Sequence, residues 1–285
     1  MENNTNKNEL IFALVDRAAA GDKAAMEELL TGVQGQVFSL SLRMLGTFPD
    51  AEDAAQDILL KVMTSLPSFR KECAFSTWVF RIAVNTLIPC KKHMFAQRPL
   101  SFDFYAADIV NAPLDGIPDM TQGVEKELLA EELKLSCTNV MLQCLDAESR
   151  CIFILGTMFG IDSRIAGEIL GITADSYRQR LSRIRRKMAD FLSDYCVEYG
   201  SGKCRCKNRL NYAIKSHRLD PAHLDFANAS ELPIEKMLEC KNAMEEIDGL
   251  SAQFAFCKAY ESPERTRRFI QEFLQSSVLS SVTEP

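Results

Sequence analysis

Residues 145–192, LDAESRCIFILGTMFGIDSRIAGEILGITADSYRQRLSRIRRKMADFL, contain the pattern of three consecutive helices. Three polar residues are placed to cap the starts of these helices: Asp146, Asp162 and Thr173. Their side-chain oxygens can accept hydrogen bonds from the first free backbone N–H groups. The helices are expected to end near Met158, Gly171 and Leu192. The short turn GITA between the second and third helices predicts a helix-turn-helix.

The third of these helices has one apolar face and one basic face. The apolar residues recur at helical spacing: Tyr177, Leu181, Ile184, Met188 and Phe191. The opposite face carries Gln179, Ser182, Arg183 and Arg186, with Arg178 and Arg185 on its flank. Arg, Gln and Ser are side chains that read base edges and phosphates in the major groove. This face therefore indicates DNA binding, and a solvated basic surface is the alternative.

The composition of the whole chain limits its class. The 285 residues allow two domains, or three small ones, and Leu, Ala, Met and Glu dominate. We therefore expect an all-α protein. A net charge of −6 excludes a general nucleic-acid coat, but it fits local DNA contacts combined with acidic protein contacts. No membrane span or signal sequence is evident, so we expect a cytoplasmic protein whose ten cysteines are reduced thiols.

Residues 48–70, FPDAEDAAQDILLKVMTSLPSFR, predict an amphipathic helix that begins with Asp50 as its N-cap and ends at Pro67. Its buried stripe is expected to contain Ala55, Ile58, Leu59, Val62 and Leu66. Its outer, acidic face carries Glu52, Asp53, Gln56 and Asp57. The spacing alone favours an ordinary solvated face for these four residues.

The next segment combines aromatic and basic residues. Residues 75–85, FSTWVFRIAVN, are expected to open a helix at Ser76 or Thr77, and Pro89 should kink or end it. Trp78, Ile82 and Leu87 are candidates for the core. Rings can stack on unpaired bases while cations follow the phosphates, so this pattern fits single-stranded DNA binding. A set of core aromatic residues at helical spacing is the alternative.

The order of these segments resembles the extracytoplasmic-function (group 4) sigma factors of bacterial RNA polymerase. The matching stretches are DAEDAAQDILLKVMTSLPSFR and FSTWVFRIAVN in the first half, and the helix-turn-helix in the second. The resemblance covers residues 9–195. It implies two small helical domains, a sigma region 2-like domain at 9–95 and a region 4-like domain at 124–195. The prolines and aspartates of residues 96–123 predict a linker between them, and the polar residues 1–8 are expected to be disordered. Residues 196–285 are expected to form a regulatory C-terminal extension.

The resemblance implies three contact surfaces. The core polymerase surface would include Asp53, Gln56 and Asp57. The single-stranded −10 element would be read, with one base flipped into a pocket, by Phe69, Arg70, Lys71, Phe75, Ser76, Arg81 and Asn85. The duplex −35 element would be read by Tyr177, Arg178, Gln179, Ser182, Arg183 and Arg186. The apolar periodicity places Tyr177 partly inside, in tension with this role.

Two departures from the family pattern affect DNA contacts. Pro89 interrupts a helix that the family usually continues with arginines, which indicates an unusual −10 preference. Ser163 and Arg164 replace an acidic pair that the family usually carries in the helix-turn-helix. Arg164 could therefore contact a phosphate, and an ordinary surface arginine is the alternative.

The C-terminal extension contains a Cys-x-Cys pattern. Cys204 and Cys206, with Cys196, could bind zinc together with His217 or His223. Reduced thiols in a basic turn are the alternative, and a redox switch is a third interpretation because Lys203, Arg205 and Lys207 would lower the thiol pKa values. Apart from this possible zinc ion, no cofactor is expected. Further helices are expected after Leu232, formed around Ile234, Met237, Phe254, Phe269 and Phe273.

The family interpretation predicts a protein without catalysis of its own, whose partners are core RNA polymerase, promoter DNA and, as a further candidate, an anti-sigma factor. A helix-turn-helix regulator with an N-terminal sensor domain would explain residues 145–192 equally well, but it would not explain the acidic helix or residues 75–85. An enzyme that uses the cysteine-rich tail as a metal site is a more distant alternative.

Overall fold

The computed structural model describes residues 2–90, 99–112, 116–200, 202, 204–226 and 264–275. Within these ranges every regular element is a helix, and the only β-pairing consists of two isolated bridges, Cys196 with Cys204 and Asp220 with His223. The predicted all-α fold class is therefore confirmed. None of the described helices combines the length and the apolar character that crossing a membrane requires.

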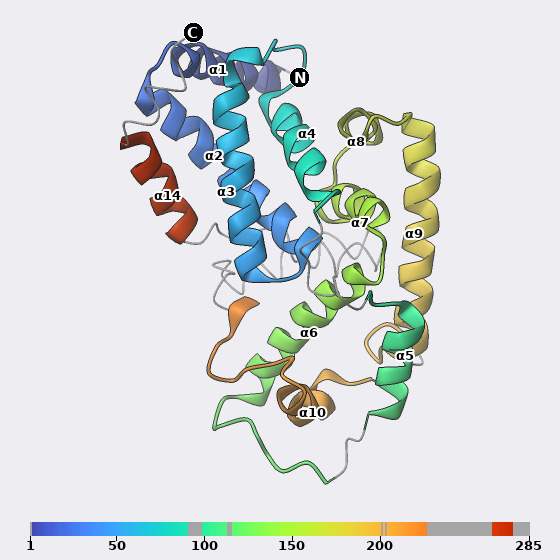
Figure 1. Cartoon of the computed structure of the whole chain (residues 1–285). Helices are drawn as coiled ribbons and strands as arrows, with labels where there is room; N and C mark the ends of the chain where they lie inside the picture. The colour runs from blue at the N-terminus through green and yellow to red at the C-terminus, as the bar shows by residue number, and fades with distance from the viewer. Residues whose placement is uncertain are drawn as a thin grey trace.

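The first unit is built around α2, Lys23–Leu45. This helix contacts α1, Glu2–Ala19, α3, Phe48–Ser65, and α4, Phe75–Leu87 (Figure 1). The Asp22 carboxylate caps it by accepting bonds from the N–H groups of Ala24 and Ala25, and Gly46 ends it in the left-handed region at φ 91°. Every residue of α2 from Val37 to Leu45 is buried, because neighbouring helices cover its C-terminal half on all sides.

Two helix starts in this unit differ from the prediction. Residues 2–8, expected to be disordered, belong to α1, since neither glycine nor proline interrupts its sequence. Thr47, rather than Asp50, caps α3: its hydroxyl accepts from the Asp50 N–H and donates to the Asp50 carboxylate at 2.6 Å. Pro49 then lies in the first turn, where a missing N–H costs nothing. The predicted buried stripe of α3 is confirmed.

The end of α3 and the start of α4 lie close to their predicted positions. After Ser65, a 3₁₀ turn at Leu66–Ser68 contains Pro67, and α4 begins at Phe75, one residue before the earlier of the two predicted starts. The last residue of α4 is Leu87, two residues before Pro89, as predicted.

The second unit contains the predicted helix-turn-helix. It begins with α6, Lys126–Gln143, on which Leu128 is exposed. The next helix, α7, Ala147–Phe153, continues as a π-helix over Ile154–Met158, and α8, Ser163–Leu170, and α9, Ala174–Tyr195, follow it. All three predicted caps are confirmed, because Asp146, Asp162 and Thr173 accept bonds from the N–H groups of Ser149, Arg164 and Ser176. Gly171 ends α8 at φ 68°.

Two glycines permit the close packing of these helices. A Cβ atom on Gly156 would lie 2.5 Å from Cδ2 of Leu181 and 2.6 Å from the Tyr177 hydroxyl, so α9 touches the backbone of the π-helix. A Cβ atom on Gly167 would lie 2.7 Å from the carbonyl oxygen of Ile172, in the turn between α8 and α9. A larger residue at either position would push these elements apart.

The predicted linker contains a helix. The described part of residues 96–123 includes α5, Phe102–Asn111, whose N-cap Ser101 accepts from the Phe104 N–H. Phe102 and Tyr105 lie against Phe191 of α9, with ring centroids 5.1 and 5.6 Å away. The buried side of this helix consists of Phe102, Tyr105 and Ala106. This amphipathic pattern is short and lies among prolines and aspartates, which predicted an irregular linker instead.

The described parts of the C-terminal extension pack on both units. A 3₁₀ turn at Cys206–Arg209 and α10, Leu210–Lys215, lie against α6, where Leu129 and Leu210 share a small core. The ring of Phe226 meets Phe48 of α3 at 5.4 Å. The last described helix, α14, Glu264–Gln275, lies against α2 and α3. The other residues on which helices were expected after Leu232, from Ile234 to Tyr260, lie outside the described residues.

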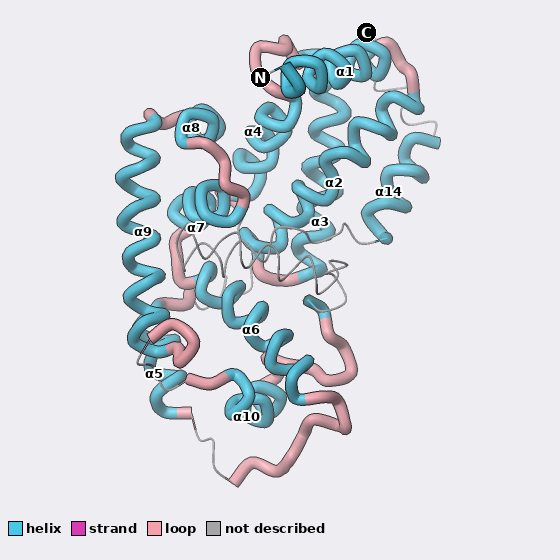
Figure 2. The backbone as a smooth tube through the Cα atoms, turned by 180° about the vertical axis from the view of Figure 1, so that it is seen from behind, coloured by secondary structure: helices cyan, strands magenta, loops and turns pink. Residues whose placement is uncertain are grey.

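Side chains of the second unit fasten it to the end of α2. Arg150 donates to the carbonyl oxygens of Leu142, Met44 and Leu145, while Asn139 and Gln143 donate to those of Gly46 and Arg43. The last carbonyls of a helix have no partner within the helix, so α6 and α7 supply the hydrogen bonds that α2 needs there. Figures 1 and 2 show the consequence, in which α8 lies between α4 and α9.

Candidate nucleic-acid interface

The apolar face of α9 packs as the periodicity predicts. Ile184, Met188 and Phe191 are buried, and so is Tyr177, which is 1% exposed. The Tyr177 hydroxyl donates to the carbonyl oxygen of Ile152 at 2.9 Å, and burial raises the pKa of this hydroxyl above its ordinary value. Tyr177 therefore holds α9 to α7, and the prediction that it contacts the −35 DNA is wrong.

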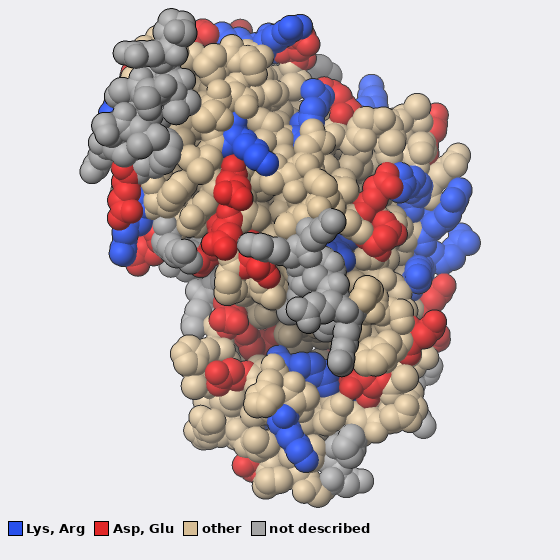
Figure 3. All heavy atoms as spheres, in the orientation of Figure 1, with Lys and Arg blue, Asp and Glu red and all other residues tan. Residues whose placement is uncertain are grey.

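The opposite face of α9 is open. Gln179, Ser182, Arg183 and Arg186 are all exposed. Within the described part of the chain, neither Arg183 nor Arg186 forms an ion pair. Figure 3 shows basic side chains gathered along α9 at the right edge of the molecule. These four residues form one surface, called here the α9 face, which could enter a major groove.

The remaining arginines of α9 have structural partners. Arg180 pairs with Glu148 of α7 at 2.6 Å, and this hydrogen bond lowers the pKa of Glu148 and raises that of Arg180. Arg185 donates to the Thr157 hydroxyl and to the carbonyl oxygen of Gly156. The number of basic residues in the α9 sequence therefore overstates the positive charge that faces DNA, because two of these arginines bind neighbouring helices instead.

Arg178 and Arg164 lie at the edge of the α9 face. Arg178 donates to the Ser163 hydroxyl at 2.9 Å and pairs with Asp175. The Arg164 side chain is 88% exposed at the start of α8. Both guanidinium groups could turn toward a phosphate. The Arg178 interactions lie at the surface, where an ion pair contributes little free energy, so replacing them by a phosphate contact would cost little.

The aromatic residues before and within α4 form a cluster instead of an open stacking surface. Phe69 and Phe75 are 7% and 4% exposed, and their ring centroids lie 5.7 Å apart. Trp78 packs on both rings, and Phe12 of α1 lies 6.1 Å from Phe69. Phe69 and Phe75, which the resemblance assigned to the −10 element, are thus buried in this arrangement, because burying two large rings is more favourable than leaving them in water.

The polar residues predicted to read the −10 element have different surroundings. Arg70, Ser76 and Asn85 are exposed, whereas Lys71 is tied to Asp16 and lies over the ring of Phe12. Arg81 donates to Glu168 of α8 at 2.8 Å. These side chains are spread along α4 and its preceding loop, and α8 contacts α4 at Arg81. Lys91, Lys92 and Arg98 lie outside the described residues.

The acidic face of α3 is open to solvent. Asp53 and Asp57 are exposed, and Gln56 is half-buried between them. Figure 3 shows acidic side chains gathered along α3 on the front of the molecule, away from the basic side chains of α9. The molecule therefore presents an acidic surface on one unit and a basic surface on the other.

The thiols of the Cys-x-Cys segment lie near a further cysteine, Cys137, which is distant from them in the sequence. Cys137 of α6 is within electrostatic range of Cys196, Cys204 and Cys206. Burial raises the pKa of Cys137 and of Cys206 to about 12, and it also raises that of Cys204. The expected lowering of the thiol pKa values by neighbouring cations is thus wrong for Cys204 and Cys206. All eight described cysteines are free.

The described side chains around these thiols are not arranged as a metal site. Among the described residues, no three His, Cys, Asp or Glu side chains are arranged to hold a metal ion. The Tyr105 hydroxyl instead donates to Sγ of Cys137 at 3.0 Å. The zinc interpretation of Cys196, Cys204 and Cys206 therefore gains no support from the positions of these side chains.

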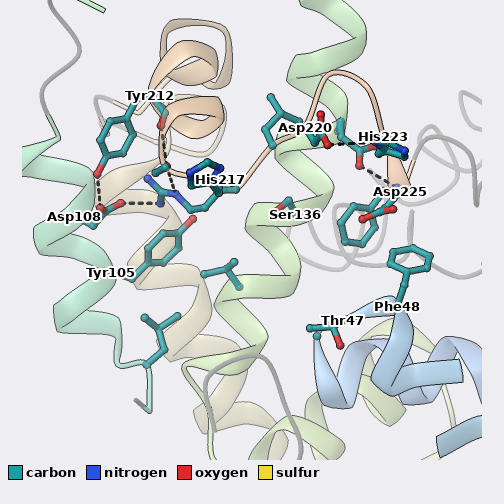
Figure 4. A pocket seen from close by; sticks show the side chains of 18 of the residues that line it. Thr47, Phe48, Tyr105, Asp108, Ser136, Tyr212, His217, Asp220, His223 and Asp225 are labelled. Carbon is teal, nitrogen blue, oxygen red and sulfur yellow. Dashed lines mark hydrogen bonds and ion pairs between the residues drawn. The ribbon is translucent and has the colours of Figure 1, made fainter. Parts of the chain in front are cut away.

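A cavity of about 590 Å³ lies where α5, α6 and the extension meet (Figure 4). On one side, Asp108 accepts from the Tyr212 hydroxyl at 2.7 Å and from Arg218 at 2.8 Å. On the other side, Phe48 and Phe226 close it with their rings. These contacts explain how the extension is fastened to the linker helix, and none of the predicted DNA-contacting residues lines the cavity.

Comparison with known proteins matches about three fifths of the chain. The Sigma-70 region 2 family model matches residues 29–89. The ECF RNA polymerase sigma-E factor of Haemophilus influenzae is 31% identical over 175 residues, which cover 61% of this chain and 90% of that protein. The sigma-E factor of Escherichia coli is 31% identical over 174 residues, 60% of this chain and 88% of that protein.

Two further matches have lower sequence identity. The RNA polymerase sigma-H factor of Pseudomonas aeruginosa is 28% identical over 174 residues, with 60% and 88% coverage. A solved structure of CnrH in complex with the cytosolic domain of CnrY covers 63% of this chain and 95% of that chain, at 22% identity and a TM-score of 0.45. About two fifths of this chain lies outside each of the sequence matches.

Proposed function

The chain belongs to the extracytoplasmic-function (ECF) sigma factors of RNA polymerase, and from this membership we propose how its two helical units divide the work. The protein binds core RNA polymerase and promoter DNA and directs transcription initiation. We infer that it acts in the cytoplasm and performs no catalysis itself. The observation that carries this proposal is the presence, in one chain, of a region 2 match at 29–89 and an open basic helix-turn-helix face behind it.

The proposed −35 contacts are those of the α9 face. Gln179, Ser182, Arg183 and Arg186 are exposed side by side on the second helix of the helix-turn-helix, in the position from which such motifs enter the major groove. Arg183 and Arg186 suit guanine edges or phosphates, and Gln179 suits adenine. Arg178 is proposed as a phosphate contact that exchanges Asp175 for DNA.

The proposed −10 contacts are the polar residues around α4. Arg70, Lys71, Ser76, Arg81 and Asn85 could follow the phosphates and base edges of a single strand. For Phe69 and Phe75, stacking on bases would require the aromatic cluster to open, so we propose that they shape the surface from beneath. An unusual −10 preference, suggested by Pro89, stays a prediction.

The proposed core polymerase contact is the acidic face of α3. Asp53 and Asp57 are exposed along one side of this helix, and Gln56 is half-buried between them. Exposed carboxylates without a buried partner contribute little to folding, which leaves them free to serve association. The residue limits of the domains and an anti-sigma partner stay predictions.

A pull-down with purified core polymerase tests the proposal against the alternative of a helix-turn-helix regulator. We expect the wild-type chain to bind core polymerase, and the double variant Asp53→Asn with Asp57→Asn to bind at least several-fold more weakly. Asp190→Asn, an exposed change on α9, is the matched control and should bind like wild type. Binding to duplex DNA without any binding to core polymerase would favour the regulator.

No cofactor is proposed to be required for either contact. Elemental analysis of the purified chain and of its Cys204→Ser variant tests this directly. Stoichiometric zinc in the wild-type chain, lost in the variant, would restore the metal interpretation of the tail.

A further inference from the structure

The cavity beside the extension has the size of a small-molecule site. Its volume of about 590 Å³ falls within the range of roughly 300–1,000 Å³ that is usual for ligand pockets. Four parts of the chain build its wall: the junction of α2 and α3, the linker helix α5, the helix α6, and residues 212–226 of the extension (Figure 4). A molecule bound here would therefore touch both units, the linker and the extension at once.

Contacts between these parts already hold the wall in place. Arg218 and the Tyr212 hydroxyl of the extension both donate to the Asp108 carboxylate of α5. On α6, Oε1 of Glu132 accepts the N–H of Phe226, a further residue of the extension, at 3.0 Å. The cavity is thus formed before any ligand enters, and a preformed site loses less free energy to ordering when it binds.

Aromatic rings form much of the apolar part of the wall. Phe48 and Phe226 meet edge to face at 5.4 Å, and Figure 4 shows Phe48 across the cavity from Tyr105 and Tyr212. The ring of Phe104 also lines the cavity and is 67% exposed. The faces of such rings attract cations, and several rings together surround the charged group in sites for quaternary ammonium compounds.

The charged groups of the wall are mainly acidic. Four carboxylates line the cavity against a single guanidinium, and this guanidinium, that of Arg218, is paired with Asp108 at 2.8 Å. Of the two histidines in the wall, His223 lies 3.3 Å from the carboxylate of Asp220. An anionic ligand would add negative charge to this wall, whereas a cationic ligand would compensate it. The four carboxylates are those of Asp108, Glu132, Asp220 and Asp225.

Two of these carboxylates are best placed to hold an ammonium group. Glu132 is 4% exposed, and a carboxylate can accept further hydrogen bonds beside the one from Phe226. Asp225 directly precedes Phe226, so the two carboxylates are neighbours in the wall. Among the described residues, no lysine or arginine pairs with Asp225, and partial exclusion of water raises the pKa of its carboxyl group. A cation beside these groups would favour their charged forms.

We propose that this cavity binds a small organic cation, an amine or quaternary ammonium compound with an apolar body. The carboxylates of Glu132 and Asp225 hold its charged group, and the rings of Phe48, Phe104 and Phe226 hold its apolar body. Neither polymerase nor DNA takes part in this binding, so the inference goes beyond the proposed function and can fail without it. Because the ligand touches the extension and both units, it stabilises the docked position of the extension by mass action.

Three probes of matched shape test the preference for positive charge. Near neutral pH, 4-phenylbutylamine is a cation, 4-phenylbutanol is neutral and 4-phenylbutyrate is an anion, and all three share a phenyl ring on a four-carbon chain. Isothermal titration calorimetry with the full chain measures each dissociation constant. The amine should bind at least about ten-fold more tightly than the alcohol or the butyrate, the size expected of one hydrogen bond to a charged group.

Two adjacent glutamates of α6 provide a matched control. Glu132 lines the cavity, whereas Glu131 is exposed and lies outside the wall. Glu132→Gln keeps an oxygen for the Phe226 N–H but removes the charge, so the amine should bind about ten-fold more weakly and the alcohol about as before. Glu131→Gln removes the same charge elsewhere and should leave all three affinities unchanged. Ser136→Phe, which places a ring in the cavity, should abolish binding of every probe.

Every outcome supports or overturns the proposed site. Equal affinities for the three probes, or an amine that shows no saturable binding, would overturn it, and so would equal effects of Glu131→Gln and Glu132→Gln. If circular dichroism shows that Glu132→Gln does not fold, the exposed substitution Asp225→Asn replaces it and should weaken amine binding by about three-fold or more. Unchanged amine binding in that variant would overturn the site. Core polymerase binding by the wild-type chain tests the proposed function separately.

Discussion

Tyr177 and Arg183 lie on the same helix of the second unit, yet they have opposite surroundings. The Tyr177 hydroxyl is bonded inside the fold, and the Arg183 guanidinium extends into solvent. Helical periodicity predicts which face each residue occupies, and it placed Tyr177 on the apolar side. The family resemblance assigned it to DNA, and the structure contradicts that assignment. Periodicity could not predict that Arg180 and Arg185 have structural partners, because those partners come from other helices.

Substitutions at these two residues should separate stability from DNA binding. Tyr177→Phe removes the bond to Ile152 and should lower the free energy of unfolding by about 1 kcal/mol, measured in urea. Arg183→Ala should leave that free energy unchanged while reducing transcription from −35-dependent promoters about ten-fold. Core polymerase binding is the control for both variants, and its loss in Arg183→Ala would contradict the assigned role.

Two glycines should respond in opposite directions to alanine. At Gly167 the new methyl group would meet the Ile172 carbonyl oxygen, so Gly167→Ala should destabilise the helix-turn-helix by about 1–3 kcal/mol. At Gly32, inside α2, nothing lies within 4 Å of the new atom. Gly32→Ala should therefore stabilise the protein by about 0.5–1 kcal/mol. Thermal unfolding of both variants measures the difference. If both substitutions changed the stability in the same direction, the close-packing explanation would be refuted.

The helix starts and ends show what local sequence determines. Asp146, Asp162 and Thr173 were predictable as caps because a cap acts within a few residues. Asp50 was not the cap of α3, since Thr47 satisfies the same first turn two residues before Pro49. The linker helix α5 was missed because its stability comes from Phe191, almost ninety residues away, and composition gives no sign of that contact.

The first turn of α7 should give the helix-turn-helix an acid dependence. Burial alone would raise the pKa of Asp146, but the hydrogen bonds from Ser149 lower it below 3.8, and Arg180 lowers that of Glu148 below 4.5. A carboxyl whose pKa is lower in the folded state stabilises the fold above its unfolded pKa. This contribution is lost as the pH falls through the folded pKa. Unfolding in urea from about pH 6 to about pH 3 should show this loss.

Asp146→Asn is the control for this acid dependence. Asparagine caps a helix nearly as well but cannot be protonated, so the variant should lose less stability over the same pH range. An identical pH profile for the wild type and the variant would show that other carboxylates dominate.

At the scale of the whole molecule, the sequence predicted the two helical units and their order, but not how they meet. The contacts of α8 with α4, and of Arg150 with the end of α2, join residues that are far apart in the chain. Such pairings depend on shape and on unsatisfied backbone groups that exist only after folding. The described parts of the extension lie on both units, which its sequence alone did not predict.

The extension should contribute to stability through α14. Ile270 and Leu274 are each 4% exposed against the first unit, so the double variant Ile270→Ala with Leu274→Ala should lower the free energy of unfolding by about 2 kcal/mol or more. Glu272→Ala, on the exposed side, should change it little. Core polymerase binding should survive in both, as it should in a chain truncated after Gly200. Equal stabilities would mean that α14 does not stay docked in solution.

The contact of α9 with the bare backbone of Gly156 has a consequence for evolution. Tyr177 and Leu181 are fixed by this contact, whereas the residues on the reverse of the helix are exposed. Natural variation can therefore alter Gln179, Ser182, Arg183 and Arg186 at little cost to folding. A duplicated copy of this chain could acquire a new set of target genes through those four positions, while inheriting its scaffold unchanged.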